Sequence, residues 1–151
     1  MTKKHPQKSA SLEKALAALQ ARYSRRLAPP MQGFAYRFTI WLPVQTLGKP
    51  VFSEEQRILI TNCIYDCCGG CSQSRLEGFP PWTGAWLPEG AAEPIVDHHI
   101  QFVIYTLQDA EAVTYLRQLK GILQLKQVAA QEVVLIEQVP VTLIAAAELP
   151  E

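Results

Sequence analysis

The strongest constraint on the fold is a two-residue alternation through residues 34–42. One parity is apolar or aromatic: Phe34, Tyr36, Phe38, Ile40 and Leu42. The other parity is mixed: Ala35, Arg37, Thr39 and Trp41. Successive side chains of a strand point to opposite faces, so this pattern predicts a half-buried strand with Arg37 and Trp41 facing away from the core.

Residues 98–106 form the clearest strand in the sequence, with apolar side chains at both parities. If Ile100, Phe102 and Ile104 belong to the core, the other face carries a polar and aromatic set: His99, Gln101, Val103 and Tyr105. A strand that is apolar on both faces indicates that its second face is covered, for example by another subunit or by the N-terminal helix.

Two helices are expected between the strands. Ser53-Glu54-Glu55-Gln56 is a capping-box pattern that begins the first helix, and Gly69-Gly70 ends it. Asp109 is the expected N-cap of the second. Its apolar face is formed by Ala112, Leu116, Leu119 and Leu123.

A second strand is expected within residues 71–96, and a final strand over 132–138, with 141–144 extending it or forming another. The order is βαββαβ, so residues 31–145 resemble the ferredoxin-like superfamily, an α+β class. The resemblance implies a four-stranded antiparallel sheet with two helices on one face. The strings Gly-Gly-Cys-Ser-Gln-Ser, Pro-Pro-Trp-Thr-Gly-Ala-Trp and Ile-Val-Asp are also similar to small uncharacterised proteins of photosynthetic bacteria, a likeness that brings no function with it.

Residues 1–30 are expected to form a basic arm with an amphipathic helix over about 11–27, and residues 31–151 the ferredoxin-like domain. The helix stripe repeats at steps of four and three: Leu12, Leu16, Leu19, Tyr23 and Leu27. Pro29 and Pro30 end the arm. A lone helix of this length is marginal in water, so its stripe is expected to pack on the body, pair with another copy, or lie on a membrane surface.

Charge is divided unevenly along a chain whose formal net charge is zero. Residues 1–30 carry seven lysines and arginines against Glu13 alone, a net +6, which leaves −6 for the remainder. Such asymmetry can indicate nucleic-acid or anionic-membrane contact. The interpretation we favour is that the arm folds back onto its own acidic body or onto a neighbouring copy.

All four cysteines lie within nine residues. Cys63 and Cys67 share a helix face with Ile60 and Ile64, so they are expected in the core, where free cysteine behaves as a small hydrophobe. Cys68 and Cys71 form Cys-Gly-Gly-Cys, a redox and metal-site spacing. This pair lies at a helix C-terminus, where the dipole opposes the thiolate.

No metal is favoured, and Cys68 and Cys71 are the alternative ligands. Cys63, Cys68 and Cys71 match the C-x4-C-x2-C spacing of plant-type iron–sulfur proteins, but the distant fourth cysteine is missing. Zinc would accept a histidine, yet His98 and His99 begin a strand expected at the opposite edge of the sheet.

A second group of candidates lies near the loop at residues 79–96. Trp82 and Trp86 could line a ligand pocket close to Trp41 and His99, or they could seal the edge of the core. Arg37 and Tyr105, expected on the same open face of the sheet, are further candidate ligand-binding residues. Asp97 and His99 would share one side of their strand, which makes them candidates for acid–base catalysis.

The composition indicates one globular domain, and the chain has neither an apolar run of about 20 residues nor a hydrophobic stretch after its basic start. Four clustered cysteines favour a reduced, cytoplasmic setting.

We expect a non-enzymatic binding or regulatory protein that forms a homo-oligomer through the sheet or the N-terminal helix. A small metal-binding protein or enzyme is the alternative. RNA binding ranks third: Phe102-Val103-Ile104-Tyr105 fits half of an RNA-binding strand motif, whose basic and glycine positions are unmatched.

Overall fold

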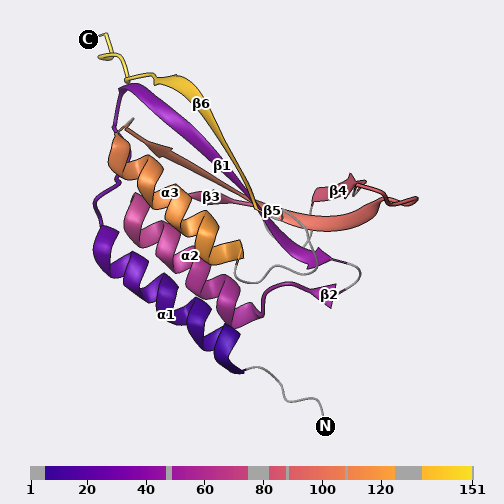
Figure 1. Cartoon of the computed structure of the whole chain (residues 1–151). Coiled ribbons are helices and arrows are strands. Elements are labelled where there is room, and N and C mark those ends of the chain that lie inside the picture. Colours follow the sequence, from indigo (N-terminus) through magenta and orange to yellow (C-terminus); the bar gives the residue numbers. More distant parts are fainter. Residues whose placement is uncertain are drawn as a thin grey trace.

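The computed structural model describes residues 6–46, 49–74, 82–87, 89–107, 109–124 and 134–150. Side chains are described from Leu12 onward within these ranges, except at residues 46, 49, 82–84, 86, 95 and 97. The described chain is an α+β structure with an antiparallel sheet and three helices on one side of it, which confirms the predicted class (Figure 1).

The sheet is built on two long neighbouring strands, β1 (Gly33–Thr46) and β5 (Ile95–Thr106). The strand β6 (Leu135–Leu143) pairs with the other side of β1. Three shorter strands complete the sheet: β2 (Lys49–Pro50) on β1, and both β3 (Ser72–Gln73) and β4 (Trp82–Trp86) on β5. Every pairing is antiparallel.

The strands differ from the expected ones in several respects. β2 was not expected, and β5 begins at Ile95, before the expected start at residue 98. β1 runs on to Thr46, past the expected end at residue 42. The region 71–96 contains two short strands where one was expected. The stretch 141–144 extends the last strand as far as Leu143. The expected start of that strand at residue 132 lies outside the described residues.

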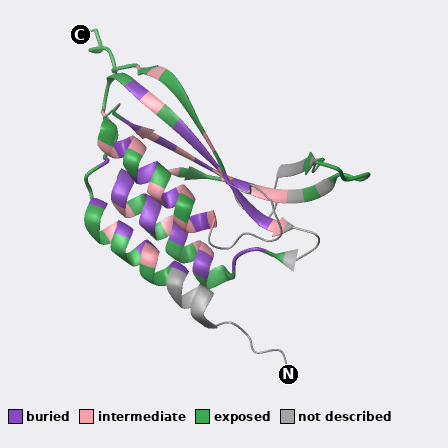
Figure 2. Ribbon diagram, in the orientation of Figure 1, coloured by how far each residue is buried: buried purple, intermediate pink, exposed green. Residues whose placement is uncertain are grey.

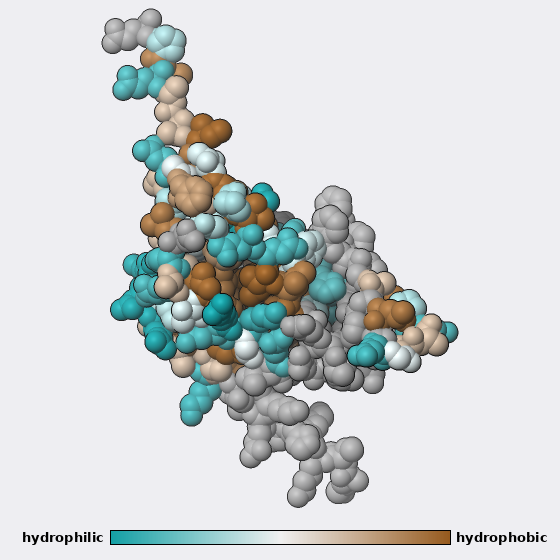
Figure 3. Space-filling view, turned by 45° about the horizontal axis from the view of Figure 1, so that its top comes forward, coloured by the Kyte–Doolittle hydropathy of each residue, from teal (hydrophilic) through white to brown (hydrophobic). Residues whose placement is uncertain are grey.

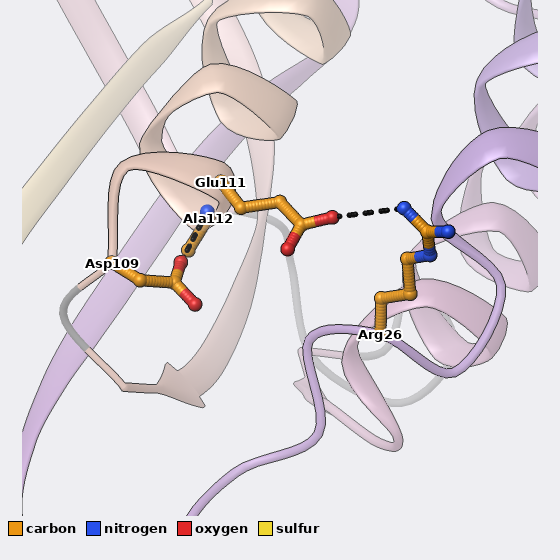
Figure 4. A network of polar contacts seen from close by, with 4 residues as sticks. All are labelled: Arg26, Asp109, Glu111 and Ala112. Carbon is orange, nitrogen blue, oxygen red and sulfur yellow. Dashed lines mark hydrogen bonds and ion pairs between the residues drawn. The ribbon is translucent and has the colours of Figure 1, made fainter.

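Both expected helix starts are confirmed. The helix α2 (Glu54–Cys68) begins at Ser53, whose hydroxyl accepts from the Gln56 N–H while the Gln56 side chain accepts from the Ser53 N–H. It ends at Gly69, which has the left-handed φ of 73°. The helix α3 (Ala110–Leu123) begins at Asp109, whose carboxylate accepts from the Ala112 N–H at 2.7 Å (Figure 4).

The helix α1 (Pro6–Tyr23) packs on α2 and α3, which themselves contact β5 and β6. Its stripe of Leu12, Leu16, Leu19 and Tyr23, together with Leu27, is at most 5% exposed and belongs to the same hydrophobic core as the sheet. The stripe was expected to pack on the body, pair with another copy or lie on a membrane surface, and in the structure it packs on the chain's own body. The surface expected to serve a second copy through the N-terminal helix is occupied within the chain.

Candidate functional site

The cysteines lie in the layer of helices between the sheet and α1. Cys63, Cys67 and Cys68 are completely buried, and Cys71 is half-buried beyond the helix. The core positions expected for Cys63 and Cys67 are confirmed. Cys68, expected at the edge of the stripe, is equally buried, because α2 is covered by the sheet on one side and by α1 on another (Figure 2).

Tyr115 joins these thiols from α3. Its hydroxyl oxygen lies 3.8 Å from Cys63 Sγ, and the Cys63 thiol also donates to the carbonyl of Leu16 at 3.9 Å. The Tyr115 ring meets Tyr23 edge to face, with centroids 5.4 Å apart. The sequence reasoning missed Tyr115, although it lies three residues after Ala112 and four before Leu119, on the face that proves buried.

Ionisation in this cluster is suppressed at most positions. Burial raises the pKa of Cys68 to about 12, with the neighbouring thiols of Cys67 and Cys71 acting in the same direction. Burial also raises the pKa of Cys71 and Tyr115. A hydrogen bond between the thiols of Cys63 and Cys67 lowers the pKa of Cys63 and raises that of Cys67.

No single described thiol combines exposure with activation. Cys63 has the lowered pKa but is completely buried under α1, whereas Cys71 is accessible but has a raised pKa. A reactive cysteine needs both accessibility and a stabilised thiolate. The arrangement therefore suits core packing better than nucleophilic or redox chemistry.

The cluster also does not suit the alternative metals. Among the residues that the structure describes, no group of three or more histidine, cysteine or carboxylate side chains is placed so that it could hold a metal ion. A structural zinc needs four such ligands, and an iron–sulfur cluster needs four thiolates or their equivalents.

The segment after α1 closes the end of α2 beside these thiols. The N–H groups of Arg25 and Leu27 donate to the carbonyls of Asp66 and Cys67 at 2.8 and 2.9 Å. These carbonyls belong to the last turn of α2, where no partner exists within the helix. A side chain at Gly69 would come within 3.3 Å of Ala28, so the two segments are in close contact.

The second candidate surface is the side of the sheet away from the helices, called here the sheet face. Ile100, Phe102 and Ile104 are buried on the helix side, which confirms the expected parity of β5. The register then places Arg37 opposite Tyr105, and Trp41 opposite Gln101. On the sheet face, His99 lies opposite Pro43, one diagonal step from Trp41.

β6 contributes to the sheet face in a way that the sequence reasoning missed. Val139 lies opposite Arg37, Glu137 opposite Thr39, and Leu135 opposite Trp41. Leu135 is 56% exposed and Val139 37% exposed. The sequence shows the alternation in β6, but it does not show that β6 pairs with β1 or in which register the two strands pair.

Several predicted site residues cannot be placed as side chains. The backbones of Trp82 and Trp86 lie in β4, and Trp82 is opposite His99. The side chains of Trp82, Trp86 and Asp97 lie outside the described residues. The pocket and the Asp97–His99 pair therefore stay predictions, and the structure adds only that Trp41, His99 and Tyr105 lie on one face.

An ion pair joins the basic arm to the body. Arg26 lies 3.2 Å from Glu111 of α3, with both side chains well exposed (Figure 4). An exposed pair of this kind contributes on the order of 0–1 kcal/mol. It agrees with the interpretation that the arm folds back onto its own acidic body.

A scan of protein-family models, a search of curated proteins and a search of solved structures each found no match to this chain. None of the helices in the described part of the chain has the length and apolar character needed to cross a membrane.

Proposed function

We propose that this chain is a non-enzymatic binding or regulatory protein that associates with a second copy through the sheet face. For the fold we infer the ferredoxin-like arrangement. The run of antiparallel neighbours β6–β1–β5–β3, with α2 between β1 and β3 and α3 between β5 and β6, supports it. Four free thiols favour a reducing compartment such as the cytoplasm.

The observation that carries the proposal is the apolar character of the sheet face. Within the described part of the chain, the helices all lie on the other side of the sheet (Figure 1). The sheet face nevertheless presents Trp41, Val103 and Tyr105 on its central strands and the exposed Leu135 and Val139 on β6. Trp41 and Leu135 are direct neighbours across β1 and β6, and apolar side chains gathered in this way mark an interaction site more often than single scattered ones do.

Charges on the sheet face favour a second copy as the partner. Arg37 on β1 and Glu137 on β6 lie one diagonal step apart on this face, between apolar neighbours. In a two-fold interface, if residue i of one copy contacts residue j of the other, then residue j of the first copy also contacts residue i of the second. Arg37 of each copy can therefore pair with Glu137 of its partner while the apolar side chains are buried.

The test compares two variants with nearly equal starting exposure. Val139 is 37% exposed on the sheet face, and Leu59 is 38% exposed on α2. Val139→Glu places a carboxylate opposite Arg37, so the new charge has a cation beside it in the folded monomer. In the dimer, the same carboxylate would have to be buried at the interface, which costs free energy. Leu59→Glu adds the same charge on the helix side of the molecule.

Sedimentation velocity over a concentration series gives the dissociation constant for each variant. We expect Val139→Glu to weaken association at least tenfold and Leu59→Glu to leave it unchanged, with the same circular dichroism spectrum for both. A wild-type chain that stays monomeric at high concentration contradicts the proposal, and so does a loss of association in Leu59→Glu alone.

A further inference from the structure

A groove, called here the edge groove, opens between α3 and β6 on the helix side of the sheet. It has a volume of about 240 Å³. Phe38, Leu116 and Ile136 form its apolar floor, and Arg117, Lys120 and Gln138 surround it. A neighbouring hollow beside Asp109 and Ala110 shares Val113 and Arg117 with it, so the concave surface continues toward the start of α3.

Residues 144–150, called here the exit segment, leave the domain directly after β6. The segment reads Ile-Ala-Ala-Ala-Glu-Leu-Pro, and its two large apolar side chains, Ile144 and Leu149, are 92% and 90% exposed. Figures 1 and 3 show it projecting away from the body. On the body below it, hydrophobic side chains gather among hydrophilic ones (Figure 3).

We propose that the exit segment of one copy docks into the edge groove of a second copy, and that the two copies exchange these segments. The chemistry matches on both sides. Leu149 supplies an aliphatic side chain of the size that the floor of Phe38, Leu116 and Ile136 can cover. Glu148 beside it is the carboxylate that meets Arg117.

The backbone of the exit segment suits this mode of binding. Pro150 restricts Leu149 to an extended conformation, so Glu148 and Leu149 point to opposite sides of the segment. Leu149 can then enter the groove while Glu148 reaches the long side chain of Arg117, which is exposed on α3.

The sequence favours exchange over folding back onto the same copy. A return from the end of β6 into the chain's own groove needs a reversal immediately after Leu143. Residues 144–149 contain no glycine, proline, asparagine or aspartate, the residues that usually make such turns. In a two-fold exchange the chain does not need to reverse. The exit segment simply continues in the direction in which it leaves β6 and reaches the groove of the second copy.

A charge swap tests the exchange directly. Arg117→Glu puts a carboxylate in the groove, and Glu148→Arg puts a cation on the segment. Each variant alone then has like charges facing each other, so its self-association should weaken by about tenfold or more. In an equimolar mixture, each groove meets a segment of opposite charge, and association should return to within about threefold of the wild type.

The measurement is sedimentation velocity on each full-length chain and on the mixture, with Lys14→Glu as the matched control for a charge reversal on an exposed face. Unchanged association in the two single variants overturns the inference. A mixture that stays as weak as its components also overturns it, because segments folded back within one copy cannot be rescued by mixing.

Arg117→Glu, Glu148→Arg and their mixture are then measured again in chains that also carry Val139→Glu. This separates the exchange of exit segments from association through the sheet face, because the exchange does not involve Val139. Rescue by mixing in that background supports the exchange whatever the sheet face contributes. If Val139→Glu gives monomers in every combination, the sheet face carries the association and the exchange is wrong. If the wild-type chain is a monomer throughout, both proposals are wrong.

Discussion

The backbone N–H of Leu27 donates to the carbonyl oxygen of Cys67 at 2.9 Å, joining the segment after α1 to the last turn of α2. Arg25 makes the same kind of contact with Asp66, from a left-handed φ of 59°. The end of α2 is thus completed by chain that lies far away in sequence. The buried thiols of Cys67 and Cys68 are held next to this junction.

Gly69→Ala should destabilise the protein through this junction. The residue has a φ of 73°, and an added Cβ would meet Ala28 Cα at 3.3 Å. The left-handed conformation alone costs an L-residue about 1–2 kcal/mol. The matched control is Gly121→Ala in α3, where a Cβ meets nothing within 4 Å and helix propensity should add about 0.5–1 kcal/mol. Urea unfolding should show shifts of opposite sign, and two shifts of the same sign would contradict this account.

Leu16→Ala should cost about 2–4 kcal/mol of unfolding free energy, because Leu16 is only 2% exposed and packs within the common core. Glu13→Ala, on the exposed side of the same helix, should stay within about 0.5 kcal/mol of the wild type. Chemical denaturation measures both. A small effect of Leu16→Ala would mean that α1 is not part of the cooperative unit.

Stability should decline with rising pH between about 9 and 12. The pKa of Cys68 is raised from 9.0 to about 12 in the folded state. Above pH 9 the unfolded chain loses this proton while the folded chain keeps it, so the free energy of unfolding falls as pH rises. The slope approaches about 1.4 kcal/mol per pH unit for one thiol. Unfolding under reducing conditions at pH 8 and pH 10 measures it, and Cys68→Ala should show a smaller slope.

Thiol titration with a disulfide reagent should distinguish Cys71 from the other cysteines. Cys71 is half-buried, whereas Cys63, Cys67 and Cys68 are completely buried. We expect one thiol to react ahead of the other three in the native protein, and all four to react after unfolding in urea. Cys71→Ser should remove the fast phase. Rapid reaction of a second thiol in the native protein would show that α1 opens readily over the cluster.

The sequence predicted those features that depend on local chemistry. The capping residues Ser53 and Asp109 and the stop at Gly69 each act within a few residues, and each is confirmed. The alternation in β1 holds only in part: Phe38, Ile40 and Leu42 are buried as expected, but Phe34 is 56% exposed, and Ala35 and Thr39 on the other parity are buried. The stripe on α1 was recognised, but its partner could not be, because amphipathicity identifies a buried face without identifying what covers it.

Register and layering account for what the sequence reasoning missed. Tyr115 of α3 meets Cys63 of α2 where α1 packs on both of these helices, a relationship with no local signature. Leu135 and Val139 join the sheet face only because β6 pairs with β1. A shift of one residue in that pairing would have moved them to the helix side.

The position of α1 has a consequence for the order of events during synthesis. This helix is made before the two helices that cover its stripe, which end only at Cys68 and Leu123. The central strand β1 likewise waits for β5 and β6, the last strand of the described chain. Native pairing therefore cannot be completed while these segments are still being made, and folding of the whole core must follow translation of β6. Until α2 and α3 have been made, the nascent chain displays the α1 stripe to any binding partner in its surroundings.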